Sequence, residues 1–228
     1  MVATVFTDEG EKSLQQYATG IQASARVVTT RTDITDDQSV SDLQRFVSEY
    51  LKKNPQKQLV GLVNNAGIAL SGPLEAQPIS QFRRQIEVNL FGHVHVAQKL
   101  TRFLRDSQGR LINVTSMAGR AAAKGMGAYA ASKFALEAVS DVQRLELARW
   151  GISVSAIEPG FMRTPLVTNA FGQLEQNWNN LLEEVITCSS LPLVLFTHRT
   201  NTGTRFVCTR IRKNQKSRNP NFGLCPFA

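Results

Sequence analysis

The chain has 228 residues, enough to bury one full core, and its hydrophobic fraction of 42% is ordinary for a globular protein. No apolar run approaches the roughly 18 residues that a membrane-spanning helix needs, and the first residues lack the pattern of a secretory signal. We therefore expect an intracellular, cytoplasmic protein rather than a secreted or membrane-spanning one.

The positive charge is concentrated at the C-terminal end. The sequence holds 26 Lys and Arg against 18 Asp and Glu, but seven of the basic residues and none of the acidic ones lie in residues 188–228. Residues 1–187 are therefore almost neutral, and we predict that residues 188–228 form a basic, disordered tail. Nucleic-acid binding by this tail is the least favoured alternative. The tail contains all three cysteines without metal-site spacing, so reduced thiols are expected: Cys188, Cys208 and Cys225.

The first half of the chain is predicted to contain three strands, at residues 2–6, 25–29 and 59–63. A short helix that holds Leu14 and Tyr17, capped by Asp8 or a neighbour, separates the first two strands. A longer helix precedes the third strand and ends before Asn54. Its apolar stripe has helical spacing: Val40, Leu43, Val47 and Tyr50 or Leu51.

The second half continues the alternation of strands and helices. A long helix begins at Ser80, the apolar run 111–114 forms a buried strand, a helix runs from Tyr129 to about Trp150, and a strand follows at 152–157. Such alternation indicates βαβ units and a parallel sheet with helices on both faces. The pattern fails after about Leu182, although residues 191–196 could form one more strand.

Three polar side chains can converge at one end of this sheet. Ser116 follows a predicted strand, while Tyr129 and Lys133 are four residues apart and so lie on one face of a helix. A tyrosine, with an ordinary pKa of about 10, exchanges protons near neutral pH only if its phenolate is stabilised, and a nearby ammonium lowers that pKa. A serine hydroxyl can hold and polarise a substrate oxygen. Alone, each residue would be read as structural; the ordered set indicates proton transfer at an alcohol or carbonyl oxygen.

Five short motifs, in this order and at these spacings, resemble the short-chain dehydrogenase/reductase family over residues 2–182: NNAG at Asn64–Gly67, Asn89 in IEVNLFG, Ser116 thirteen residues before Tyr129, the pair Tyr129 and Lys133, and Pro159-Gly160. The segments GLVNNAGI and EVNLFGHVHVAQ are most similar to the branch of retinol, 17β-hydroxysteroid and 3-hydroxybutyrate dehydrogenases.

The resemblance implies four catalytic residues, Asn89, Ser116, Tyr129 and Lys133, with Asn89 holding a water between Lys133 and solvent. It implies no metal and a nicotinamide cofactor bound by nine residues: Asp33, Asn65, Ala66, Gly67, Tyr129, Lys133, Pro159, Gly160 and Thr164. A cap on the following helix is an equally good reading of Asp33. Asp8 and Glu9 favour NAD, with NADP as the alternative, because an acid repels a 2′-phosphate. His93 and His95 are expected to be packing or surface residues.

The resemblance implies an α/β fold, a doubly wound Rossmann-type parallel sheet, but residues 1–187 lack the family's first strand and Gly-rich turn. We therefore expect an incomplete Rossmann-type domain, from an incomplete or alternatively processed product of a dehydrogenase gene, with its flanking strands about 10 Å apart. The flanking strands could close up, residues 191–196 could fill the gap, or another chain could donate a strand. The sequence favours none of the three.

The function implied is an oxidoreductase that transfers a hydride between a nicotinamide cofactor and a secondary alcohol or ketone. A lipophilic substrate such as a steroid or retinoid is expected. The alternative is a non-catalytic, truncated family member that acts through helix-mediated dimerisation. In either case the two long helices imply a homodimer or higher oligomer, and the resemblance also allows association with the endoplasmic reticulum.

Overall fold

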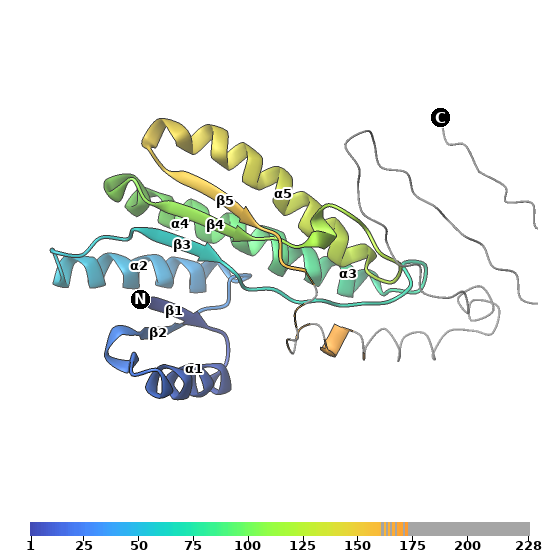
Figure 1. The fold of residues 1–228 in the computed structure, drawn as a ribbon, viewed down its shortest axis with the longest axis horizontal. Coiled ribbons are helices and arrows are strands. Elements are labelled where there is room, and N and C mark those ends of the chain that lie inside the picture. Colours follow the sequence, from blue (N-terminus) through green and yellow to red (C-terminus); the bar gives the residue numbers. More distant parts are fainter. Residues whose placement is uncertain (161, 163, 165, 167, 171, 173–228) are drawn as a thin grey trace, which may run out of the picture. The chain divides into compact units, whose positions relative to one another are not determined.

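The computed structural model describes residues 1–160, 162, 164, 166, 168–170 and 172, and Figure 1 shows how the elements are arranged. The chain divides into two units, Met1–Asn180 and Leu181–Ala228. The predicted tail of residues 188–228, its cysteines and the candidate strand at 191–196 lie outside the described residues, so these predictions stand as they were made.

The N-terminal part is one parallel βαβ unit. Strands β1 (Val2–Val5) and β2 (Val28–Arg31) pair in parallel, and α1 (Asp8–Gly20) connects them. The cap of α1 is Thr7, whose hydroxyl accepts a hydrogen bond from the Gly10 amide. The prediction placed the second strand three residues too early, because Ser24–Arg26 instead form a 3₁₀ turn.

The second sheet has three parallel strands in the order β3 (Gly61–Asn64), β4 (Arg110–Val114) and β5 (Ser153–Ile157). Each predicted strand is confirmed within two residues. The strands are paired in register, so Asn64 lies beside Asn113 and Val114 beside Ile157. Their carboxyl ends therefore meet at one edge of the sheet, where the loops that carry the motifs begin.

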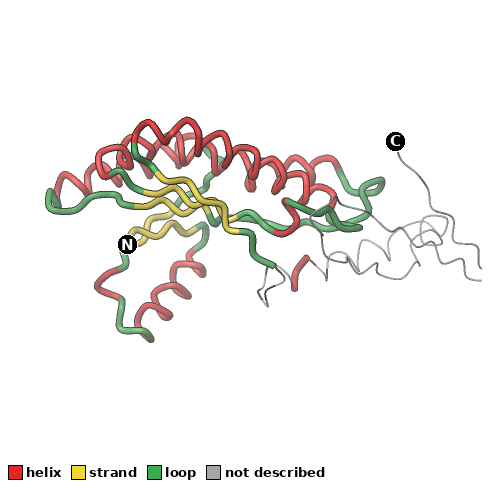
Figure 2. Tube along the Cα trace, turned by 45° about the horizontal axis from the view of Figure 1, so that its top comes forward, coloured by secondary structure: helices red, strands yellow, loops and turns green. Residues whose placement is uncertain are grey.

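Long helices cover one face of this sheet, as Figure 2 shows. They are α2 (Asp37–Lys53), α4 (Gly92–Ser107) and α5 (Gly127–Leu147), and α5 continues as a 3₁₀ turn to Trp150. Gly151, at a φ of 69°, ends it as predicted. The helix expected from Ser80 is interrupted: α3 (Ile79–Ile86) passes into a π-helical turn, Glu87–Phe91, before α4. Such turns occur often at functional sites.

Two apolar clusters hold these layers together. The predicted stripe of α2 packs against α4 in the first cluster: Val40, Leu43, Val47, Val96, Leu100 and Phe103. The second lies between α4 and the strands and contains Leu104 and Leu111, both fully buried, with Ala97, Ile152 and Val154. Each large apolar side chain contributes roughly 1.5–3 kcal/mol by leaving water. Tyr17, which was expected in the short helix, is 67% exposed and lies outside both clusters.

The two sheets remain separate within the described residues. Among the residues that the structure describes, β1 pairs only with β2 and β3 pairs only with β4, so closing up of these flanking strands, one of the three possibilities, is not what the structure shows. The parallel α/β arrangement is as predicted, but α2, α4 and α5 all cover one face of the three-stranded sheet, where helices were expected on both faces. Across the part of the chain that the structure describes, no helix is both long enough and apolar enough to cross a bilayer.

Candidate active site

A buried polar network fixes the strand ends from which the site is built. The side-chain Nδ2 of Asn64 donates to Asn113 Oδ1 at 2.9 Å and to the His93 backbone carbonyl at 3.3 Å. Asn113 in turn donates to Ser140 Oγ at 2.8 Å and to Gln143 Oε1 at 2.9 Å, both on α5. Because buried amides are costly without partners, this network links β3, β4, α4 and α5 in one arrangement.

Ser116 and Tyr129 come together at the end of β4. Ser116 caps the short 3₁₀ turn Met117–Gly119, where its hydroxyl accepts from the Ala118 amide at 3.1 Å. Tyr129 lies in the first turn of α5, is 9% exposed and packs in a small cluster with Ala69. Its side chain hydrogen-bonds with that of Ser116; burial raises the pKa of Tyr129 above its ordinary value, and this bond opposes the rise.

Lys133 lies one turn further along α5, on the same face as Tyr129, as predicted. Its side chain is buried, and Nζ donates to the Val114 carbonyl at 2.8 Å and lies 5.8 Å from the centre of the Tyr129 ring. Burial lowers the pKa of Lys133 from 10.5 to about 8. The expected lowering of the Tyr129 pKa by Lys133 is not found, because Nζ bonds the Val114 carbonyl and burial of the phenol dominates.

Asn89 lies in the π-helical turn and is fully buried. Its side chain accepts from the Ile68 amide at 2.9 Å and donates to the Ile68 carbonyl at 2.9 Å and to Ser132 Oγ at 3.1 Å. Asn89 therefore braces the loop after β3 against α5, next to Lys133. Its role in holding a water for Lys133 stays a prediction.

The loop after β3 lies close to this group of residues. A Cβ atom on Gly67 would be 3.4 Å from Asn89 Oδ1 and 4.0 Å from Lys133 Nζ, so glycine keeps space there. Asn65 and Ala66 are exposed in the same loop. The Asn64–Gly67 motif thus reaches the residues predicted to be catalytic.

His93 is a residue whose role the sequence did not reveal. It is 2% exposed, and its Nε2 lies 2.6 Å from the Ala66 carbonyl. Burial, and then the charge of Lys133, lower the pKa of His93 from 6.5 to about 4, so the ring is neutral at pH 7. Neutral His93 donates from Nε2 to Ala66 and holds the loop. His95, by contrast, takes no part in this loop, and its Nδ1 lies 3.4 Å from Asp37 Oδ1 on α2.

The turn after β5 also belongs to the site. The Met117 amide donates to the Pro159 carbonyl at 3.1 Å, which places this turn beside the one that Ser116 caps. A Cβ atom on Gly160 would lie 3.4 Å from the Met117 side chain. Thr164 is half-buried and its carbonyl accepts from the Thr168 amide at 3.1 Å, and its contact with the cofactor carboxamide stays a prediction.

Asp33 lies in another loop, between β2 and α2. Its carboxylate accepts from the Thr35 amide at 2.9 Å and hydroxyl at 2.7 Å, and the bond from the hydroxyl is the main reason that the pKa of Asp33 is lowered. The cap of α2 is Asp36, which accepts from the Ser39 amide at 2.7 Å. The alternative that Asp33 caps this helix is therefore wrong, and its contact with adenine stays a prediction.

The residues present fit the nicotinamide half of a nicotinamide cofactor, but not its pyrophosphate. Lys133 offers a donor in a dry setting, and Gly67 and Gly160 leave the backbone open where a side chain would crowd a ligand. Residues 1–160 contain no Gly-rich turn for a pyrophosphate. The same described residues hold no group of three His, Cys, Asp or Glu placed to bind a metal.

Comparisons with known proteins agree with this geometry. The family model described as short chain dehydrogenase matches residues 2–175. Human retinol dehydrogenase 5 is 44% identical over 170 residues, which cover 74% of this chain and 50% of that protein. A 3β-hydroxysteroid dehydrogenase of Caenorhabditis elegans, dhs-16, is 33% identical over 186 residues, 80% of this chain and 48% of that protein.

The fold is found in solved structures as well. The crystal structure of NAD⁺-bound xylitol dehydrogenase matches with a TM-score of 0.67 at 25% identity, over 76% of this chain and 65% of that one. The chain spans about half the length of the curated relatives that it matches. Together with the Ser116, Tyr129 and Lys133 constellation, the family model and these relatives show that the chain belongs to the short-chain dehydrogenase family.

Proposed function

We propose that this protein is a nicotinamide-dependent oxidoreductase that interconverts a secondary alcohol and its ketone. The observation that carries the proposal is the placement of Ser116 at the end of β4 beside Tyr129 on α5, with the Lys133 amine one helical turn further along the same face. The kinship with dehydrogenases supports an enzyme over the non-catalytic alternative.

The proposed chemistry assigns one task to each side chain. Ser116 holds the substrate oxygen, and Tyr129 gives that oxygen a proton or takes one from it. Because burial raises its pKa, Tyr129 is protonated at pH 7 and is ready to act as an acid toward a ketone. Lys133, with a pKa of about 8, can pass a proton onward near neutral pH. When bound, the nicotinamide supplies or accepts the hydride at the carbinol carbon.

The substrate is proposed to be lipophilic. Two relatives support this choice, since one is named a retinol dehydrogenase and the other a 3β-hydroxysteroid dehydrogenase. For the cofactor we propose NAD. Asp8 and Glu9 in the first turn of α1 support it, although Arg31 pairs with Asp8 at 3.0 Å and offsets one of these acids.

A turnover assay on the full chain tests the proposal. Absorbance of the reduced nicotinamide would be followed with a 3β-hydroxysteroid, which is a secondary alcohol, or with retinol, which is a primary one, and with NAD or NADP as cofactor. We expect turnover with the 3β-hydroxysteroid, faster with NAD, and turnover with retinol alone would contradict the assignment of a secondary alcohol. Folded protein without turnover in any of the four combinations would contradict the proposal, and turnover with NADP alone would contradict the cofactor assignment.

We propose further that two copies of the chain pair through α4 and α5. Three apolar side chains of α5 support this, since all are exposed and lie within one side of the helix: Phe134 at 45%, Val142 at 51% and Leu145 at 79%. Sedimentation analysis should give a dimer that Leu145→Lys dissociates, while Tyr17→Lys on α1 leaves it intact. A monomeric wild-type chain would contradict this. Association with the endoplasmic reticulum stays a prediction.

A further inference from the structure

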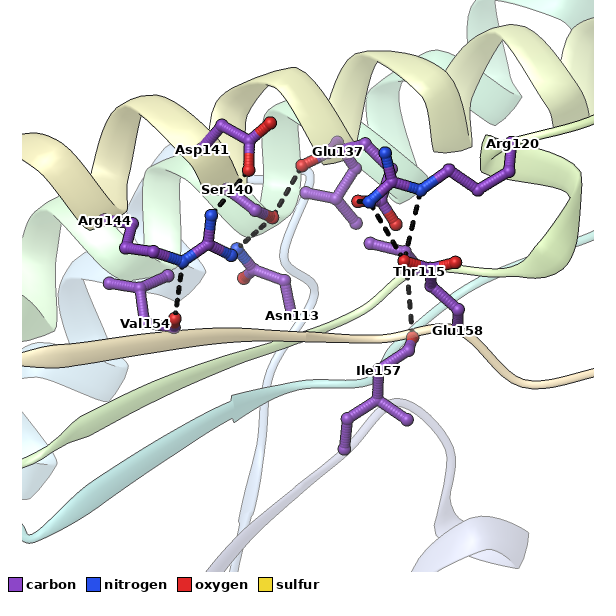
Figure 3. Close-up of polar contacts among 11 residues, drawn as sticks. Asn113, Thr115, Arg120, Glu137, Ser140, Asp141, Arg144, Val154, Ile157 and Glu158 are labelled. Atoms are coloured by element: carbon purple, nitrogen blue, oxygen red, sulfur yellow. Dashed lines mark hydrogen bonds and ion pairs between the residues drawn. The ribbon is translucent and has the colours of Figure 1, made fainter. Parts of the chain in front are cut away.

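An arginine with carboxylate partners on two other segments lies directly after the turn that Ser116 caps. The Arg120 amide closes this turn by donating to the Met117 carbonyl at 2.9 Å. Its guanidinium reaches Glu137 on α5, where Nη2 lies 3.0 Å from Oε2. It also donates to Glu158 Oε1 from Nε at 3.1 Å and from Nη2 at 3.0 Å, as Figure 3 shows. One side chain therefore joins three separate segments.

Glu137 is the buried member of this group. Its side chain is 6% exposed, whereas that of Arg120 is 56% exposed and that of Glu158 is 36% exposed. Within the described residues, Glu137 Oε1 has no hydrogen-bond partner. A buried carboxylate is costly unless a cation compensates it, so Arg120 is the group that allows Glu137 to stay at this position.

Each of the three joined segments carries part of the site. The turn carries Ser116, α5 carries Lys133 one helical turn before Glu137, and Glu158 directly precedes Pro159. The segments also approach each other closely. A Cβ atom on Gly119 would lie 3.0 Å from the Lys133 carbonyl, so the turn packs directly on α5 at that point.

We propose that Arg120 is a positioning residue that, through Glu137 and Glu158, sets the spacing between Ser116, Lys133 and the Pro159-Gly160 turn. It contacts no reacting atom and acts only through these carboxylates. The inference deepens the proposed function and rests on it for its effect on turnover, whereas the tether itself can be measured without turnover. A guanidinium suits this task because its fork spans two carboxylates, which a single ammonium does less well.

The test uses variants in which residue 120 still offers a positive charge to the buried Glu137 carboxylate, so that no buried charge is left without a partner. Arg120→Lys retains a cation for Glu137 but loses the fork, and Glu158→Gln removes the second anchor while Arg120 still compensates Glu137. The matched control is Arg45→Lys on α2, whose arginine pairs with Asp42 at 2.7 Å far from the site in the chain. Amide hydrogen exchange by NMR and steady-state kinetics would be measured on the full chain.

We expect the Met117 and Ala118 amides to exchange about tenfold faster in Arg120→Lys and in Glu158→Gln, because the turn is less firmly held, with no change at Leu111. The turnover number should fall about ten- to a hundredfold with little change in KM, since misplaced groups slow the chemical step more than they weaken binding. Arg45→Lys should change neither quantity.

Three other outcomes are informative. Unchanged exchange at Met117 and Ala118 in both variants would overturn the inference. Faster exchange with an unchanged turnover number would overturn it too, because Arg120 would then be merely structural. If the wild-type chain has no turnover but the exchange rises in both variants, the tether is supported and the proposed function fails.

Discussion

The two sheets of this protein differ in how completely their residues are buried. The three-stranded sheet has two apolar clusters against its helices and fully buried residues such as Leu111 and Asn113. In β1, α1 and β2 only Val5 and Ala18 are buried, and neither belongs to a cluster among the described residues.

The difference explains where the chemistry can be placed. Lys133, Asn89 and the bond between Ser116 and Tyr129 all depend on exclusion of water, which strengthens polar interactions and shifts pKa values. Among the residues that the structure describes, only the three-stranded sheet and its helices provide such surroundings. The N-terminal βαβ part exposes Phe6, Tyr17 and Ile21, and its strands β1 and β2 and its helix α1 contain no comparable buried polar group.

The largest effect is expected from the buried network of the three-stranded sheet. Asn113→Leu keeps the volume but removes the partner of Asn64 and of two groups on α5. Losing three hydrogen bonds of this network, each worth up to roughly 1.5 kcal/mol, should lower the free energy of unfolding by on the order of 4 kcal/mol in urea denaturation. Gln38→Leu, on an exposed amide of α2, is the control and should cost far less. Equal effects in the two variants would remove the contrast.

A smaller effect is expected from acid. The pKa of His93 is held near 4, below its ordinary value of 6.5, so the unfolded chain takes up the proton first. This contribution to stability is complete above pH 6.5 and is lost as the pH falls toward 4, by about 3 kcal/mol in total. His93→Gln should remove that part of the pH dependence. A pH dependence that is the same in the variant and the wild-type chain would contradict the neutral, buried imidazole.

The smallest effect compares one residue type in the two sheets. Val154 on β5 and Val5 on β1 are 6% and 8% exposed, but only Val154 belongs to an apolar cluster. Val154→Ala should cost about 2 kcal/mol and Val5→Ala about 1 kcal/mol, because less surrounding structure loses contacts in the second case. A larger loss in Val5→Ala would show that the N-terminal unit is the better packed one.

Much of this arrangement could be predicted from the sequence because it depends on local spacing. The stripe of Val40, Leu43 and Val47, the strand before Ser116 and the shared face of Tyr129 and Lys133 all follow from periodicity. These features need no knowledge of distant contacts.

The remaining features depend on partners far away in the sequence. Asn89 forms hydrogen bonds with Ile68 and Ser132, which are 21 and 43 residues distant in the sequence, and no periodic spacing predicts either bond. The pKa of Tyr129 depends on burial, which a motif does not report. Glu137 could have been noticed, since it lies four residues after Lys133 on the buried face of an amphipathic helix.

The most direct test of the account compares two tyrosines, one from each region. Tyr129→Phe removes the hydroxyl that exchanges the proton, whereas Tyr17→Phe removes an exposed hydroxyl of α1. The turnover number with a lipophilic alcohol and NAD should fall about 10²- to 10⁴-fold in Tyr129→Phe and stay unchanged in Tyr17→Phe. A Tyr129→Phe variant that turns over as fast as the wild-type chain would contradict the proposed mechanism.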